Sequence, residues 1–404
     1  MHLPDLEPPD AVPLCAVRNR LHEVQGHRIL VRVDLNVPTG SNHEVLCDYR
    51  FRRIVGLIDI LVKLHCVVIL ISHCGRPHGR PDPECSLEPF VAPLQRLLAR
   101  KIHFLPDCVG PEVEHAIHKA PSGSVFLLEN LRFHPGEVAA DPEFAKQLAR
   151  LADCYINDSF SVSHRAHAST VVLPHLLPAY ASPSFVHEYQ MALNLVRAIQ
   201  PPMVVISGGR KLDKLLIYKQ LMHRIDSLLL GSGFSDTYAE HPEVLGDPAT
   251  VAHRIITPPD LVVARPGALH VVEWDALTKG TTPVDIGPRA VELYCSKIES
   301  AGTLLFNGAP GILDPDHPLS SHKALLHAFI SAHSLKVVFG GTGCSLFMRS
   351  GLARQVHYIF PGGGALLSFL NNQSNPAIPL LSRNGWSALS RTASSHQSGK
   401  EGPS

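Results

Sequence analysis

Short apolar runs that end in small, polar or charged residues alternate along the chain with stretches of helical periodicity. In the first half these runs are RILVRVDLNVP (28–38), CVVILISHCGRP (66–77), SVFLLENLRF (124–133) and DCYINDSF (153–160). In the second half they are MVVISGG (203–209), SLLLGSG (227–233), TLLFNGAPG (303–311), KVVFGGTG (336–343) and HYIFPGGGA (357–365). The runs are apolar throughout rather than alternating, which is typical of strands buried on both faces of a parallel sheet. Helix-like segments such as 52–64 and 87–100 separate them, so the pattern predicts an α/β fold.

The two halves end their predicted strands differently, which indicates two domains with different ligands. Arg, Asp, Asn and His follow the strands of the first half, whereas glycines follow those of the second. We predict two doubly wound, mostly parallel-sheet (Rossmann-like) domains, residues 1–184 and 185–382, joined by a helical hinge. The end of the second segment is expected to pack back on the first domain. The Ser- and Gly-rich stretch 383–404 is expected to be a disordered tail.

Composition and charge exclude several classes of protein. The chain has 404 residues, with 36 Lys+Arg against 36 Asp+Glu, so no dominant basic face for nucleic acid is expected. No apolar run reaches the roughly 18 residues that span a bilayer, and the N-terminus lacks a signal-peptide pattern. The nine cysteines include no CxxC pair, which favours free thiols in a reducing compartment. The cytoplasm is therefore the expected location.

Polar and cationic side chains gather at the ends of the first-half strands. The carboxyl ends of parallel strands meet at one edge of a sheet, where ligands bind. The residues expected at that edge are Arg32, Asp34, Asn36, Arg53, His73, Arg76, Arg132, His164 and Arg165. Guanidinium groups are always charged and bind phosphate or carboxylate through two donors. These strand ends therefore predict a pocket for a small, multiply anionic ligand.

A less specific interpretation pairs each arginine with a nearby acid. The candidate pairs are Arg32 with Asp34, Arg132 with Glu129, and Arg165 with Asp158. Most of the 25 histidines are expected to be surface or packing residues. No HxxxH or HExxH spacing supports a metal site, so no metal ligands are predicted.

Glycines follow almost every predicted strand of the second half. The candidates for backbone contact with a ligand are Gly208, Gly209, Gly231, Gly340, Gly341 and Gly363. Glycine lets backbone N–H groups approach a phosphate, and a following helix N-terminus favours an anion. Neither a Walker motif nor GxGxxG occurs, and tight turns need glycine in any case. The pattern suggests a nucleotide crevice, in which Lys211 and Lys214 either neutralise phosphates or are solvated lysines on an exposed helix.

With these motifs in place, the chain resembles the phosphoglycerate kinases. The matching strings are VRVDLNVP (31–38), LISHCGRP (70–77), SLEP (86–89), DCVGPEVE (107–114), LLENLRFH (127–134), INDSF (156–160), HRAHAS (164–169), FNGAPG (306–311) and PGGGA (361–365). They occur in the family's order and span roughly residues 10–382.

The resemblance implies an activity and its partners. The family reversibly transfers a phosphoryl group between ATP and the carboxylate of 3-phosphoglycerate, with Mg²⁺ accompanying the nucleotide. The implied partners are therefore 3-phosphoglycerate or 1,3-bisphosphoglycerate and ATP or ADP, with no nucleic acid and no membrane. The resemblance also implies a monomer whose two domains close by hinge bending.

The resemblance assigns roles to individual residues. On the acid side, Asp34 and Asn36 would hold the substrate's hydroxyl and carboxyl end, while its 3-phosphate would be held by His73, Arg76, Arg132 and Arg165, with His164 beside them. On the nucleotide side, the implied contacts are Gly208, Gly209, Lys211, Lys214, Gly231, Asn307, Gly363 and Asp314, which stands where the family has a ribose-binding Glu. The implied catalytic groups are Arg53, Lys214, Gly340 and Gly341.

Two motifs of the second half depart from the family pattern. The family's GGGDT string reads GGTGC here, with Gly343 in place of an Asp that helps to hold Mg-nucleotide. GGRKLDK (208–214) is one residue shorter than its counterpart, and one deletion turns a helix by about 100°. The leading hypothesis is a working kinase. The alternatives are a catalytically impaired protein that binds 3-phosphoglycerate or acts as a scaffold, and a kinase for another small phosphorylated acid.

Overall fold

The computed structural model describes residues 12–37, 39–40, 44–45, 47–210, 212–265, 268–277, 281–311, 320–371 and 375–382. These residues form two compact units. The N-terminal unit comprises the described residues up to Gln190 together with 375–382, and the C-terminal unit comprises those from Met191 to Asn371. The division falls inside helix α8 (Pro183–Ala198), a few residues beyond the predicted one.

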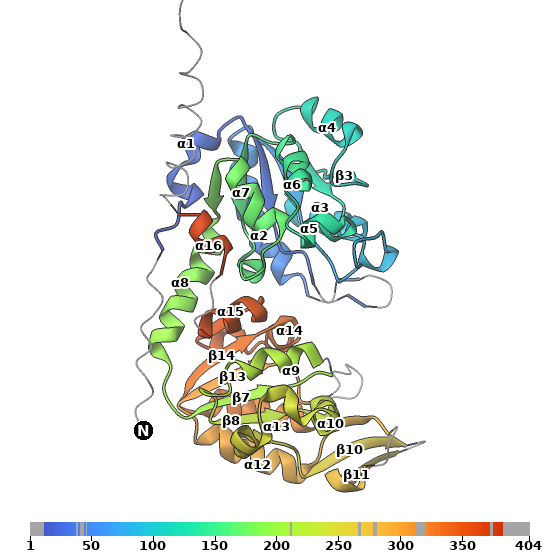
Figure 1. Cartoon of the computed structure of the whole chain (residues 1–404), viewed down its shortest axis with the longest axis vertical. Coiled ribbons are helices and arrows are strands. Elements are labelled where there is room, and N and C mark those ends of the chain that lie inside the picture. Colours follow the sequence, from blue (N-terminus) through green and yellow to red (C-terminus); the bar gives the residue numbers. More distant parts are fainter. Residues whose placement is uncertain are drawn as a thin grey trace, which may run out of the picture. The chain divides into compact units, whose positions relative to one another are not determined.

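A six-stranded parallel sheet in the order β3-β4-β2-β1-β5-β6 forms the centre of the N-terminal unit (Figure 1). Its strands are β1 (Arg28–Arg32), β2 (Val67–Ile71), β3 (His103–Leu105), β4 (Val125–Leu128), β5 (Cys154–Asn157) and β6 (Ala179–Ala181). Its helices are α1 (Leu21–Val24), α2 (Tyr49–Lys63), α3 (Val91–Leu98), α4 (Pro111–His118), α5 (Pro135–Val138), α6 (Pro142–Ala149), α7 (Leu173–Leu176), the start of α8, and α16 (Ala377–Leu380). A π-helical turn, Ala168–Val172, precedes α7.

Amphipathic helices cover the apolar strands of this sheet. All residues of β2 are buried, as expected for a central parallel strand. On α2 the buried residues Phe51, Ile54, Ile58 and Leu61 recur at helical spacing and join the core under the sheet. The chain also returns to this unit near its end, where the Cys15 amide donates to the Leu381 carbonyl at 2.7 Å.

The C-terminal unit contains a second six-stranded parallel sheet, in the order β15-β14-β13-β7-β8-β9. Its strands are β7 (Met203–Ser207), β8 (Ser227–Leu230), β9 (Ile255–Ile256), β13 (Thr303–Asn307), β14 (Leu335–Phe339) and β15 (Tyr358–Phe360). Its helices are the end of α8, α9 (Leu212–Lys219), α10 (Ser232–Glu240), α11 (Pro248–Val251), α12 (Pro288–Glu299), α13 (Ser320–Ser331), α14 (Gly341–Arg349) and α15 (Gly363–Leu370). Phe306, Phe329 and Phe347 pack edge to face in its core, with ring centroids 5.1–5.6 Å apart.

The predicted α/β class with two mostly parallel sheets is confirmed. Every apolar run named from the sequence contains a strand of one of the two sheets. A small antiparallel sheet was not predicted: β10 (Asp260–Arg265) lies between β11 (Ala268–Glu273) and β12 (Pro283–Ile286). Across the described ranges, no helix combines the length and apolar character that a bilayer crossing requires.

Candidate active site

The sheet order brings the polar strand ends of the N-terminal unit together. Strands β4, β2, β1 and β5 are neighbours, and all are parallel. The winding direction reverses between β1 and β5, which is where an open α/β sheet has its ligand crevice. A hydrogen bond crosses this point, because the Ser161 hydroxyl, beyond β5, donates to Asp34 Oδ2, beyond β1, at 2.5 Å.

A cavity of about 440 Å³ opens beside this edge and is lined by cationic side chains. Arg76, Arg132, Arg165 and His167 all line it. Arg132 is only 6% exposed. Its Nη1 donates to the Gly75 carbonyl at 2.7 Å, while its Nη2 is buried without a partner. Burial, followed by the charges of Arg165 and Arg32, lowers the pKa of Arg132 to about 10. An anion in the cavity would remove this electrostatic cost.

The alternative in which each arginine pairs with a nearby acid does not hold. None of the three candidate pairs forms a hydrogen bond or ion pair in the described part of the chain. Glu129 instead accepts from the Ser86 hydroxyl and the Leu87 amide. Arg165 Nε lies 3.4 Å from His164 Nε2 rather than beside Asp158. Arg132 and Arg165, which line the cavity, are therefore available to a ligand rather than paired with these carboxylates.

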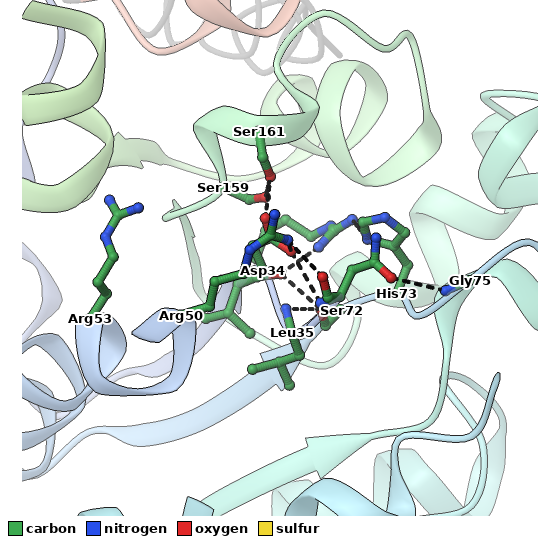
Figure 2. A network of polar contacts seen from close by, with 12 residues as sticks. Asp34, Leu35, Arg50, Arg53, Ser72, His73, Gly75, Ser159 and Ser161 are labelled. Atoms are coloured by element: carbon green, nitrogen blue, oxygen red, sulfur yellow. Dashed lines mark hydrogen bonds and ion pairs between the residues drawn. The ribbon is translucent and has the colours of Figure 1, made fainter. Parts of the chain in front are cut away.

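Asp34 is held at the crevice by Arg50 (Figure 2). Arg50 forms an ion pair with Asp34 and donates to the Asn36 carbonyl at 2.9 Å. Burial raises the pKa of Asp34, but the Arg50 charge and the Ser161 hydrogen bond outweigh burial and keep it below the ordinary value. Asn36 is exposed, and its Oδ1 accepts from the Gly75 amide at 3.1 Å. Asn36 thereby ties the loop that carries Arg76 to the end of β1.

Arg53 does not lie with these residues, although the sequence pattern groups it with them. It forms an ion pair with Glu188 on α8, and it points away from Asp34 in Figure 2. Arg50 and Arg53 are three positions apart on α2, so they lie on the same side of the helix about one turn apart, and each long side chain reaches a different partner. The string DYRFRR offers several closely spaced arginines, and periodicity alone cannot say which one faces the crevice. Arg50 is thus the functional candidate that the sequence pattern misses.

The histidines at this edge are uncharged. Burial, followed by the charges of Arg165 and Arg132, lowers the pKa of His164 to about 4. Burial, followed by the charges of Arg132 and Arg165, lowers the pKa of His167 to about 3. Burial, then Arg32, also lowers the pKa of His73 well below its ordinary value. These side chains therefore offer hydrogen bonds rather than additional charge at this edge, and His167 is the one of the three that lines the cavity.

In the C-terminal unit the winding of the second sheet reverses between β7 and β13, which is where an open α/β sheet is expected to form its ligand crevice. Gly208 follows β7, and an added Cβ would lie 1.5 Å from the Ala309 carbonyl oxygen, so only glycine fits there. Asn307 ends β13, and its Nδ2 donates to the hydroxyl of the buried Tyr218 at 2.6 Å. The Ser207 hydroxyl donates to the same oxygen at 2.9 Å. Tyr218 fixes Asn307 at the crevice and is a second residue that the sequence pattern misses.

Gly340 is the N-cap residue of α14 and Gly341 is its first residue, at the end of the loop that follows β14. Gly340 has φ +78° and lies so close to Asn307 Oδ1 that an added Cβ would be 2.6 Å from it. The first N–H groups of the nine-residue helix α14 follow directly, and such groups attract anions. Gly231 is the N-cap residue of α10, and Gly363 is the first residue of α15. Gly209 lies in the loop after β7 and has φ +134°. Lys211 and Asp314 lie outside the described residues, as does the side chain of Lys214.

The described residues around α14 do not fit a magnesium ion held by the protein. Mg²⁺ prefers oxygen ligands, usually one or two carboxylates together with phosphates and water. Gly343 is buried, and its Cβ position faces the Gly308 amide at 3.2 Å. Among the described residues, the only group of three or more side chains with metal-ligand chemistry is Asp107, Cys108 and His134, in the N-terminal unit.

Comparison with known proteins places this geometry in a family. The family model described as phosphoglycerate kinase matches residues 19–246 and 235–373. "Phosphoglycerate kinase" of Moorella thermoacetica is 36% identical over 382 residues, which cover 89% of this chain and 97% of that protein. "Phosphoglycerate kinase" of Chelativorans sp. is 35% identical over 390 residues, which cover 90% of this chain and 98% of that protein.

Solved structures agree with this comparison. The structure of phosphoglycerate kinase from Coxiella burnetii aligns over 91% of this chain and 99% of its own, with a TM-score of 0.65 and 26% identity. The fold is also shared with phosphoglycerate kinase from Pyrococcus horikoshii, over 89% of this chain and 96% of that one, with a TM-score of 0.73 and 22% identity. The sequence and the structure of this chain match those of phosphoglycerate kinases over most of its length, from the basic sheet edge to the glycine-rich crevice. The chain therefore belongs to the phosphoglycerate kinase family.

Proposed function

We propose that this chain transfers a phosphoryl group reversibly between ATP and the carboxylate of 3-phosphoglycerate, a step of glycolysis. The observation that carries the proposal is the convergence of Arg76, Arg132 and Arg165 on one cavity beside Asp34 and Asn36. A phosphorylated three-carbon acid is negative at both ends. This edge offers the cavity arginines for the phosphate and Arg50, beside Asp34, for the carboxylate.

On the acid side, the 3-phosphate would be bound by Arg76, Arg132 and Arg165, with His73 and His164 as uncharged donors. Asp34 and Asn36 would orient the hydroxyl and carboxyl groups. Arg50, rather than Arg53, would stabilise charge on the reacting carboxyl and phosphoryl groups. Arg50 is favoured because it contacts both Asp34 and the Asn36 carbonyl.

On the nucleotide side, Asn307 and the amides that follow Gly340 and Gly341 would meet the phosphates. Lys214 would add positive charge. The other proposed contacts are Gly208, Gly209, Lys211, Gly231, Asp314 and Gly363. Mg²⁺ would enter with the phosphates of ATP or ADP, whose oxygens are its preferred ligands.

Phosphoryl transfer needs positioning and charge neutralisation more than covalent chemistry. The proposed site supplies both through fixed guanidinium groups and backbone amides. The comparisons do not favour the non-catalytic alternative, because relatives named phosphoglycerate kinase align with nearly the whole chain. A monomer in the cytoplasm remains our expectation, and light scattering during size-exclusion chromatography tests the first part of it.

A coupled assay tests the proposed activity. Full-length protein is given ATP, Mg²⁺ and 3-phosphoglycerate, and formation of the acyl phosphate is followed through its reduction by a coupling dehydrogenase. We expect turnover that depends on all three components. D-Glycerate, which lacks the phosphate, is the matched substrate control. Absence of turnover at high enzyme concentration, with 3-phosphoglycerate binding retained, would reject catalysis and support a sensor or scaffold.

A further inference from the structure

A row of buried polar side chains lies behind the anion cavity and centres on Arg32. This residue, at the end of β1, is only 1% exposed. Its Nη1 donates to the Val33 carbonyl at 2.5 Å, and its Nε lies 3.2 Å from Ser169 Oγ. Its Nη2 lies 2.9 Å from His73 Nδ1. All three nitrogens of the guanidinium group therefore have acceptors within the protein, which leaves Arg32 oriented by its surroundings rather than by a ligand.

Glu137 determines the direction of the hydrogen bonds in this row. The Ser169 hydroxyl donates to Glu137 Oε1 at 2.7 Å, and the Ser169 amide donates to Glu137 Oε2 at 3.0 Å. The carboxylate is fully buried. Because the hydroxyl proton of Ser169 points to Glu137, the lone pairs of its oxygen are left to accept from Arg32.

The contact between Arg32 and His73 determines where the imidazole proton resides. A guanidinium group has donors but no acceptor. His73 Nδ1 must therefore accept, so it carries no proton, and the proton of the neutral ring is on Nε2. A cationic ring would direct an N–H at the guanidinium. The charges that act most strongly on His73 come from several elements and are cationic, namely Arg32, Arg132, Arg165 and Arg50.

The opposite nitrogen of the ring is left for a ligand. His73 is 3% exposed, and the hydrogen bond from Arg32 is on the Nδ1 side. In the described ranges, the buried nitrogens without a partner include Nδ1 of His164 and Nδ1 of His167 but not Nε2 of His73. No group of the described residues accepts from Nε2, and Nε2 is not among the buried atoms without a partner, so it is not sealed from solvent.

We propose that Arg32 is a positioning residue that, oriented by Ser169 and Glu137, holds His73 in the neutral tautomer protonated on Nε2. His73 then presents a hydrogen-bond donor to an oxygen of the phosphorylated acid. This inference rests on the proposed function for the identity of the ligand, but the tautomer is a property of the free protein. Because the ring stays neutral, its contribution to binding does not titrate near neutral pH.

Nitrogen-15 NMR of the full chain without ligand tests the tautomer directly. The His73 ring signals are identified as those missing from the His73→Gln variant. We expect Nδ1 to behave as an unprotonated, pyridine-type nitrogen from about pH 8 down to about pH 5, well past the ordinary histidine pKa. A protonated Nδ1, or a ring that becomes cationic near pH 6.5 as an ordinary histidine does, overturns the proposal. Neither result depends on whether 3-phosphoglycerate binds, so a failed activity assay leaves this test intact.

A matched pair of variants tests which ring nitrogen serves the ligand. The amide nitrogen of His73→Gln reaches about as far as Nε2, whereas that of His73→Asn reaches only as far as Nδ1. Calorimetric titration with 3-phosphoglycerate should show the Gln variant binding roughly tenfold more tightly than the Asn variant, the worth of about one hydrogen bond to a charged group. Equal affinities, or tighter binding by the Asn variant, contradict the proposal.

Arg32→Gln separates positioning from a merely structural role. The amide oxygen of the introduced glutamine can accept a hydrogen bond from Nδ1–H of His73. The substitution also removes the positive charge nearest to the His73 ring. We therefore expect His73 to sample the other tautomer and the KM for 3-phosphoglycerate to depend on pH in the range where histidines titrate. A His73 ring spectrum identical to that of the unmodified protein would overturn the proposal. If Arg32→Gln does not fold, the ring spectrum of the unmodified protein and the Gln–Asn pair still decide.

Discussion

At the scale of single residues, the site is built from charges that repel one another. Arg132 is surrounded by Arg76, Arg165 and Arg32, and one of its buried nitrogens lacks a partner. Burial alone would be costly for a guanidinium, and the neighbouring cations add to the cost. A fold retains such a cluster when a bound anion compensates for it, so the electrostatic stress identifies the binding site.

Arg132→Met should weaken binding of the acid without unfolding the protein. Loss of a charge-assisted hydrogen bond of about 1.5–3 kcal/mol corresponds to a rise in KM for 3-phosphoglycerate of about 10- to 100-fold. Steady-state kinetics at fixed ATP would measure it. Arg150→Met is the matched control, because Arg150 is exposed and pairs with Glu114 far from the cavity. An unchanged KM in Arg132→Met would remove Arg132 from the site.

A second prediction concerns Asp158, whose pKa is raised to about 7 by burial. An unfolded Asp has a pKa near 3.9. Between these two pKa values the folded state therefore binds more protons than the unfolded state. The stability that the neutral carboxyl provides is lost as pH rises toward about 7. The free energy of unfolding of Asp158→Asn, relative to the unmodified protein, should rise with pH by up to about 1.4 kcal/mol per unit. Urea unfolding between about pH 5 and pH 8 measures this difference. A difference independent of pH would show that Asp158 ionises normally.

At the scale of elements, helix α2 contributes one arginine to the crevice and another, about one turn further along, to an ion pair with helix α8. Its apolar residues pack under the sheet, Arg50 faces Asp34, and Arg53 reaches Glu188 on α8. Burial raises the pKa of Glu188, although Arg53 opposes this shift. Arg53 therefore offsets part of the cost of burying the Glu188 carboxylate, whereas the pair formed by Arg50 lies where the substrate is proposed to bind.

Conservative changes at these two positions should separate their roles. Arg50→Lys should lower kcat by about 10²-fold or more, because a lysine cannot reproduce the paired donors of a guanidinium. Arg53→Lys should instead lower the midpoint of urea unfolding and change kcat by only a few-fold. Arg52→Lys is the control for the helix, since Arg52 is exposed and pairs with Asp48. A larger loss of kcat in Arg53→Lys than in Arg50→Lys would restore Arg53 as the catalytic arginine.

At the scale of the whole molecule, ligand binding and stability are linked, because an anion that neutralises the basic cavity binds the folded state and not the unfolded chain. Such a ligand adds about 2.7 kcal/mol to the free energy of unfolding at a concentration about 100 times its Kd. Added salt should weaken the effect, since it screens charges at the partly open cavity.

The full-length protein should therefore melt at a higher temperature with 3-phosphoglycerate than without it. Scanning calorimetry measures the Tm, and the same concentration of D-glycerate is the control for the phosphate. Arg132→Met should lose most of the increase. A Tm that rises equally with D-glycerate would show that the cavity does not recognise the phosphate.

The pattern of apolar runs was sufficient to predict the fold class. Central parallel strands are buried on both faces and therefore need apolar residues at every position. Each run meets this need with its own residues, so it can be recognised without knowledge of the rest of the chain. Short strands such as β3 and β9, and the antiparallel sheet of β10, β11 and β12, escaped prediction. These elements have partly exposed or brief apolar segments, so pairing with a neighbour rather than local pattern decides them.

The sequence by itself determined which residue types follow each strand, and therefore that a basic edge and a glycine-rich edge exist. Only the tertiary structure decided which arginine faces the crevice, because Arg50 and Arg53 differ in the partner that each reaches rather than in chemistry. The same is true of Tyr218, which reaches Asn307 across a large separation in sequence, and of Arg32, whose contact with His73 joins two strands. Residue type is local information, whereas the orientation of a side chain depends on packing between distant segments.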